Sequence, residues 1–180
     1  MGARVVCNCA PRAELVRVEL APGLPAQQCE ACGGVLLGMA DHRHWREAAA
    51  VSALPGEAAP ALSDSPSARA CPACTRLMQR YRAGMTPDFR VDHCPACQLV
   101  WLDKGEWQAL AQAGLATRLG EIVSAAWQRR VQGDELRARR EAGLRSKHGD
   151  ACIDEIKRVR EWLDGQAQRD ELIALLRAGW

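Results

Sequence analysis

Aromatic side chains are scarce in this sequence. The 180 residues include six Trp, one Tyr and one Phe, in a composition that is otherwise ordinary at 48% hydrophobic and 26% charged. A large core would have to consist mainly of Leu, Val and Ala, and the chain length suits one or two small domains. Small domains with thin cores usually need a staple, such as a metal ion or a disulfide.

Long apolar runs are also missing. No segment provides the roughly 20 apolar residues of a membrane-spanning helix, and the opening MGARVVCNC lacks the apolar region of a secretory signal. We therefore expect a cytoplasmic protein with no membrane partner. In a reducing compartment, paired cysteines are more often metal ligands or redox groups than structural disulfides.

Catalytic motifs and a strong net charge are absent as well. The sequence has no H-E-x-x-H motif, no phosphate-binding Gly loop and no nucleophile beside a base. These absences predict a protein that is not an enzyme and has no small-molecule substrate. The formal charge is +2, and eight zinc-bound thiolates with two Zn²⁺ ions would change it to about −2. A protein that coats nucleic acid through its overall charge is thereby excluded.

Cysteine is the residue that the sequence has in excess. Eight of the nine cysteines form two groups of four: Cys7, Cys9, Cys29 and Cys32, then Cys71, Cys74, Cys94 and Cys97. When the sequence is aligned with itself so that Cys29 falls on Cys94, the segment CEACGGVLLGMADHRHW also aligns with CPACQLVWLDKGEWQAL. We infer a duplicated module whose first copy has diverged.

The spacing of each group indicates zinc. Two C-x-x-C pairs about twenty residues apart are typical of a four-thiolate site, because each turn directs two thiolates at one metal and a hairpin joins the turns. We predict two structural Zn²⁺ ions held by the eight clustered cysteines. The first group opens on C-N-C, one residue shorter than usual, so a metal-free first module is the alternative. Gly33, after Cys32, supplies a left-handed backbone position that such a turn often requires.

The cysteines and histidines also have possible roles other than zinc ligation. A redox C-x-x-C needs a thiolate at a helix N-terminus, whereas the QLVWL after Cys97 is typical of a strand. A redox function would therefore take the form of an oxidation-sensitive zinc site. We expect His42, His44 and His93 to be surface or packing residues, and Cys152 to be a small buried side chain.

Helical periodicity follows the second module. Asp103 and Glu106 predict an N-cap with a capping box, and apolar residues at three- and four-residue steps predict one amphipathic helix to about Gln132. Gly114 and Gly120 are the weak points of this helix. Further helices are expected from Asp134 and from Asp150.

The expected fold is a small zinc-stabilised α+β protein. It has two zinc ribbons, each a short antiparallel β hairpin followed by a helix, and a C-terminal α-helical region. The boundaries are residues 1–52 for a degenerate ribbon, 53–70 for a linker rich in Ala, Pro and Ser, 71–112 for the second ribbon and 113–180 for the helical region.

The second module resembles a known family. Its CPAC, then VDHCPACQLVWLDKGEWQAL, is similar to the bacterial zinc-ribbon family of the transcription factor IIB type, clearly over residues 71–110 and, through the internal repeat, weakly over 7–50. The family's ligand positions are occupied by Cys71, Cys74, Cys94 and Cys97, and its signature by Trp101, Leu102, Asp103, Gly105 and Glu106. The first module has LLGMAD instead and lacks this signature. The resemblance implies a structural metal and is compatible with binding of nucleic acid, of polymerase or of other proteins.

Three functions therefore stay open. We predict docking to a protein partner or self-association, because Trp107, Trp127, Trp162 and Trp180 are candidate interface anchors, although they would equally suit a core. The alternative is a nucleic-acid-binding transcription regulator that uses the basic stretch 129–147, whose charges are Arg129, Arg130, Arg137, Arg139, Arg140, Arg145 and Lys147. Such a run is also typical of a solvated helix face. A zinc-thiolate redox sensor is the third.

Overall fold

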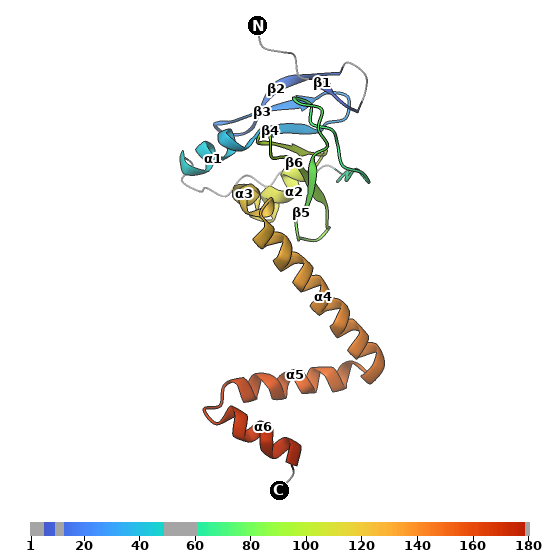
Figure 1. Cartoon of the computed structure of the whole chain (residues 1–180), viewed down its shortest axis with the longest axis vertical. Coiled ribbons are helices and arrows are strands. Elements are labelled where there is room, and N and C mark those ends of the chain that lie inside the picture. The colour runs from blue at the N-terminus through green and yellow to red at the C-terminus, as the bar shows by residue number, and fades with distance from the viewer. Residues whose placement is uncertain (1–5, 10–12, 49–60, 179–180) are drawn as a thin grey trace. The chain divides into compact units, whose positions relative to one another are not determined.

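A computed structural model of the whole chain describes residues 6–9, 13–48 and 61–178. The chain divides into two compact units, Met1–Val131 and Gln132–Trp180, which we call the ribbon unit and the helical unit. The ribbon unit combines strands with short helices, whereas the helical unit contains helices and their connections (Figure 1). Among the described residues, no helix is both long and apolar enough to cross a membrane.

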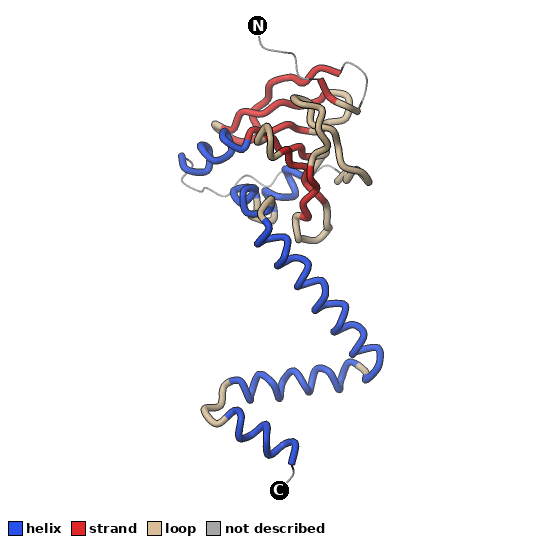
Figure 2. The backbone as a smooth tube through the Cα atoms, viewed as in Figure 1, coloured by secondary structure: helices blue, strands red, loops and turns tan. Residues whose placement is uncertain are grey.

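One antiparallel sheet runs through the ribbon unit, with the strand order β1-β2-β3-β4-β7-β6-β5 (Figure 2). The strands are β1 (Val6–Cys7), β2 (Ala13–Ala21), β3 (Leu24–Cys29), β4 (Val35–Gly38), β5 (Gln79–Arg82), β6 (Arg90–Cys94) and β7 (Leu99–Leu102). Each predicted ribbon contributes one half of this sheet. The two halves are joined by antiparallel pairing of β4 with β7.

The sheet separates two hydrophobic clusters. Side chains alternate between the faces of a strand, so Val35 and Leu37 of β4 belong to one cluster and Leu36 to the other. The first cluster, which we call the helix-side core, includes Trp45, Trp107, Leu110, Leu119 and Trp127. The second, the thiol-side cluster, contains seven of the eight clustered cysteines, all except Cys9, together with Leu36, Met78 and Trp101.

Short helices supply the helix-side core: α1 (Met39–Ala48), α2 (Glu106–Gln112), η1 (Ala116–Arg118), α3 (Leu119–Ile122) and the first turns of α4 (Ala125–His148). The prediction of one helix from Asp103 to about Gln132 is therefore wrong. Gly114 has a φ of +67°, its N–H donates to the Ala111 carbonyl at 3.0 Å, and the Leu115 N–H donates to the Leu110 carbonyl at 2.7 Å. This is a Schellman motif, which ends α2 and redirects the chain.

The helical unit contains the rest of α4, α5 (Asp150–Asp164) and α6 (Arg169–Ala178). The predicted start of α5 at Asp150 is confirmed, but α4 begins at Ala125 rather than Asp134. Cys152 is exposed, so its predicted burial is wrong. Only Ile153 and Leu163 are buried hydrophobic residues in the described part of this unit.

The predicted α+β class is confirmed by the antiparallel sheet, the helices and the two groups of four cysteines. The described half of the predicted linker, residues 61–70, is attached to the second ribbon. Its Ser63 N–H donates to the Lys104 carbonyl at 3.0 Å, and Leu62 packs against the helix-side core. The other half, 53–60, lies outside the described residues.

Candidate metal centres

The second group of cysteines comes from two turns that the hairpin brings together. Cys71 and Cys74 precede β5, Cys94 ends β6, and Cys97 lies in the turn to β7. Their four Sγ atoms all lie within 4.8 Å of one another. Cys71 and Cys94 are buried, whereas Cys74 and Cys97 are partly exposed. The two turns thus form a cage of four sulfur atoms, with two of its cysteines buried and two partly exposed to solvent.

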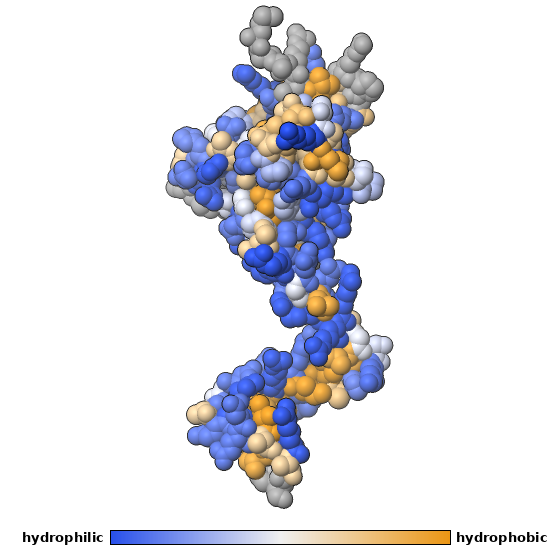
Figure 3. All heavy atoms as spheres, in the orientation of Figure 1, coloured by the Kyte–Doolittle hydropathy of each residue, from blue (hydrophilic) through white to orange (hydrophobic). Residues whose placement is uncertain are grey.

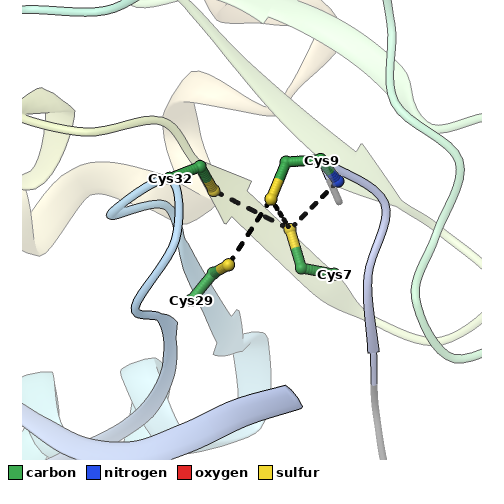
Figure 4. A group of neighbouring side chains, drawn as sticks. All are labelled: Cys7, Cys9, Cys29 and Cys32. Carbon is green, nitrogen blue, oxygen red and sulfur yellow. Dashed lines mark hydrogen bonds between the residues drawn. The ribbon is translucent and has the colours of Figure 1, made fainter. Parts of the chain in front are cut away.

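The first group is assembled in the same way despite its short opening turn. Cys7 ends β1 and Cys9 follows it, while Cys29 ends β3 and Cys32 lies in the turn to β4. Figure 4 shows the four thiols pointing toward one another, and their Sγ atoms also lie within 4.8 Å. Cys9 is the exposed member of this cluster. Although the C-N-C turn is one residue shorter than C-x-x-C, both Cys7 and Cys9 therefore join the sulfur cluster.

The sulfur separations fit a tetrahedral zinc site. With Zn–S bonds of about 2.3 Å, the edge of a regular sulfur tetrahedron is about 3.8 Å. The Sγ–Sγ distance is 3.7 Å from Cys74 to Cys94, 3.7 Å from Cys7 to Cys32 and 3.5 Å from Cys9 to Cys29. Cys7 and Cys9, which are only two positions apart in the sequence, are closer, with their Sγ atoms at 3.1 Å. Both donor sets suit Zn²⁺, and four thiolates would complete its coordination.

Each complete C-x-x-C turn is followed by a residue in the left-handed region. Gly33, Thr75 and Gln98 have φ angles of +72°, +62° and +52°. The Gly33 N–H donates to the Cys29 carbonyl at 2.7 Å, and the Thr75 N–H donates to the Cys71 carbonyl at 2.8 Å. The left-handed position predicted at Gly33 is confirmed. Sequence reasoning missed the other two, because Thr and Gln rarely adopt this conformation.

Burial and backbone N–H groups act in opposite directions on the thiols. Burial raises the pKa of Cys7 and of Cys71. The Arg76 N–H, with further bonds from neighbouring thiols, lowers the pKa of Cys74 to about 7. Burial opposes the same change at Cys29, yet the Cys32 N–H and the adjacent thiols lower its pKa to about 7. Each cage therefore contains one thiol whose lowered pKa favours the thiolate, which is the form that binds metal.

The comparison with known protein families agrees with this geometry. Residues 70–113 match the transcription factor zinc-finger family. This segment is a zinc-binding zinc ribbon, with Cys71, Cys74, Cys94 and Cys97 in its cage, as the sequence predicted. The first ribbon and the helical unit lie outside the match. No curated protein and no solved structure matched the chain.

Among the signature residues of the zinc ribbon, Asp103 does not form the helix N-cap that the sequence predicted. Gly105, with a φ of +86°, occupies the N-cap of α2, and the Asp103 carboxylate accepts from three other groups. These are the Arg69 guanidinium at 2.8 Å, the Ser65 N–H at 2.9 Å and the Trp101 Nε1–H at 2.9 Å. The Arg69 guanidinium also lies 4.9 Å from the centroid of the Trp101 ring. Asp103 thus fastens residues 65–69 to the strand that leaves the cage.

Glu106 forms one half of the predicted capping box. Its Oε2 accepts from the Asp103 N–H at 2.7 Å, while its Oε1 has no hydrogen-bond partner among the described residues. The side chain is 0% exposed, and burial raises its pKa to about 9. A carboxylate oxygen of Asp64 also lies within 4.8 Å of this pair. We assign no metal to these three acids, because Arg69, Arg80 and Arg90 bind the Asp103 and Asp64 carboxylates.

The histidines lie outside both sulfur cages. His42 is 2% exposed, and its Nε2 is 2.7 Å from the Ala116 carbonyl oxygen. His93 is also buried, and its ring packs edge-on against Tyr81. His44 is exposed on α1. These positions are those of packing and surface residues, as expected from the sequence.

Proposed function

We propose that this is a non-catalytic docking protein, in which structural zinc stabilises the ribbon unit and the helical unit binds protein. Four thiolates would saturate each zinc ion and leave no open position for a substrate or an activated water. Each metal would instead contribute folding energy, on the order of 10 kcal/mol per site as in zinc-finger peptides. Zinc thus compensates for the thin core that the scarcity of aromatic residues implies.

The observation that carries this proposal is the distribution of exposed apolar side chains. Of the nine large hydrophobic residues that are exposed in the described part of the chain, seven lie in the helical unit. They are Leu136, Leu144, Ile156, Val159, Trp162, Leu175 and Leu176. Exposed apolar side chains concentrated on so small a unit are characteristic of an interaction site.

The tryptophans that suggested docking at the sequence level have mixed positions. Trp107 is 4% exposed and Trp127 is 6% exposed, and their indole N–H groups donate to the Leu20 and Ala83 carbonyls. Both are core residues, so their prediction as interface anchors is wrong. Trp162 is 56% exposed and is the anchor that we retain. Trp180 lies outside the described residues.

Nucleic-acid binding through residues 129–147 is the alternative function. Several of its charges have intramolecular partners: Arg137 pairs with Asp134, Arg139 with Glu135, and Arg145 with Glu141, Asp150 and Asp154. Arg130 stacks on the Trp127 ring at 4.0 Å. The stretch itself has seven basic and three acidic side chains, but the helical unit as a whole, residues 132–180, has ten of each. The acids of the unit, and the ion pairs that they form with this stretch, reduce its electrostatic attraction to phosphate, which favours protein docking.

The thiols support a reducing location and leave a second alternative. All nine cysteines are free thiols, which a reducing compartment such as the cytoplasm would maintain. In a zinc-thiolate redox sensor, the exposed Cys9 would be the first ligand that an oxidant reaches. Structural zinc without redox switching remains our main proposal, because no cysteine of the second cage is as exposed as Cys9.

Affinity capture with the zinc-loaded chain tests the proposal. Wild type is compared with Ile156→Glu and with Leu77→Glu, since both side chains are exposed apolar residues and Leu77 lies in the ribbon unit. If the chain docks to protein, wild type should retain bound proteins after nuclease treatment. Ile156→Glu should lose these proteins, and Leu77→Glu should retain them. Retention that disappears on nuclease treatment and falls steeply with salt would instead favour nucleic acid.

A further inference from the structure

We propose that α5 and α6 form a dimerisation hairpin, and that the protein bound by their apolar groove is a second copy of this chain. This inference rests on the proposed docking function, because it names the partner of that surface. It concerns the helical unit alone.

The groove lies between the two helices of the hairpin. Ile156, Val159 and Leu163 of α5 line it from one side and Ile173 of α6 from the other, around a volume of about 330 Å³. The three α5 residues are three and four positions apart, so they lie on one face of the helix. Figure 3 shows apolar side chains gathered over α5 and α6 in this view.

The hairpin cannot bury its apolar residues by itself. Ile156 is 57% exposed and Val159 is 40% exposed, and no residue of α6 is buried. Helices of 15 and 10 residues are marginally stable in water unless tertiary packing covers an apolar face. A partner that covers these side chains would stabilise the folded hairpin by mass action, and a second copy of the same chain is available as that partner.

The charges around the groove favour a copy of the same surface. In a twofold interface each surface meets itself, so an excess of one sign would cause repulsion. The rim here has two acids and two bases: Glu155, Asp164, Arg160 and Arg169. Asp164 pairs with Arg169 at 2.8 Å and with Arg160 at 3.9 Å. Two copies of a rim with no net charge can therefore meet without net repulsion. A surface adapted to a charged partner would instead have an excess of the opposite charge.

Pairing of two such hairpins produces a familiar arrangement. Two antiparallel helix pairs that face each other bury their apolar stripes in a four-helix bundle. Ile156, Val159 and Leu163 would then form the centre of the interface, with the polar rim at its edge. Trp162, 56% exposed, and Leu176, 68% exposed, supply further apolar surface to this bundle.

Sedimentation of the purified, zinc-loaded full chain over a wide concentration range tests the inference. We expect a wild-type dimer, and an increase of about a hundredfold or more in the dimer dissociation constant for Ile156→Glu, which places a charge at the centre of the interface. Leu77→Glu, a change at a 71% exposed site in the ribbon unit, should leave the dimer intact. Far-ultraviolet circular dichroism verifies that each variant keeps its helices.

Charge complementation provides a second test that does not depend on loss alone. Val159→Glu and Val159→Lys should each weaken the dimer, and a mixture of the two should form a heterodimer, because a twofold interface centred on the groove would place residue 159 of one copy near residue 159 of the other. A wild-type chain that is monomeric at every concentration would overturn the inference. So would a dimer that all groove substitutions leave intact.

The two proposals fail in different ways. A monomeric wild type whose captured proteins are still lost with Ile156→Glu overturns the dimer and leaves the docking function standing. A monomer that captures nothing overturns both, because neither a second copy nor another protein then binds the groove.

Discussion

Leu36 of β4 lies directly opposite Trp101 of β7 in the antiparallel ladder that joins the two ribbons. The internal repeat superposes these same two positions, so a local pseudo-twofold axis passes between them. The flanking pairs obey the same symmetry: Val35 with Leu102, and Leu37 with Val100. The duplicated modules thus meet as two subunits meet in a twofold dimer, with one chain supplying both sides.

The first prediction concerns zinc content. Wild type should contain two zinc ions per chain by elemental analysis, because both cages have four converging thiols. Cys97→Ser should contain one and lose the second ribbon's fold, whereas Cys152→Ser, a change at an exposed thiol outside both cages, should keep two. One zinc in the wild type would mean that the C-N-C cage is empty, and none would refute the metal assignment.

The second prediction concerns the contact between the ribbons. A Cβ added to Gly34 would lie 2.3 Å from Cζ2 of Trp101, so Gly34→Ala should destabilise the ribbon unit by about 1–3 kcal/mol. Gly143→Ala is the matched control, because this helical glycine has open space at its Cβ and should gain about 0.5–1 kcal/mol. Denaturant unfolding of both variants gives the comparison. Equal stabilities would show that Trp101 does not pack on Gly34.

The third prediction concerns the ion pair between Arg69 and Asp103. Their charged atoms lie 2.8 Å apart, and their side chains are only 19% and 6% exposed. Arg69→Ala leaves the Asp103 carboxylate buried without its cation, so we expect a loss of about 2–4 kcal/mol in the free energy of unfolding. Arg137→Ala removes an exposed pair with Asp134 and should cost less than about 1 kcal/mol. A similar small loss for both would contradict the structural role of Asp103.

The fourth prediction concerns pH. Burial raises the pKa of Glu106 from 4.5 to about 9, so the folded state binds a proton that the unfolded state releases between these values. Wild type should therefore lose stability relative to Glu106→Gln as pH rises from 6 to 9, by up to about 1.4 kcal/mol per pH unit. Unfolding with zinc in excess at several pH values measures this difference. Glu121→Gln, a change at an exposed site, should run parallel to wild type. A flat difference for Glu106→Gln would show that Glu106 is already ionised at neutral pH.

Much of the metal chemistry could be predicted because it is local. Ligand identity, the two-residue gap of a C-x-x-C turn and the left-handed Gly33 depend on residues close in sequence. The same is true of α5, whose ends at Gly149 and Gly165 follow from short-range backbone preferences. The helix expected across Gly114 was wrong, because its Schellman motif outweighed an apolar periodicity that continued on the far side.

The sequence alone therefore determined the two groups of cysteines that the structure brings together, the α+β class and the family resemblance at residues 71–110. Only the tertiary structure decided that two ribbons share one sheet, that Trp107 and Trp127 belong to a core, and that Asp103 binds Arg69 instead of capping a helix. The reason is physical. A metal turn closes over a few residues, whereas strand pairing and burial bring together residues far apart in the chain, and no local pattern specifies which partners meet.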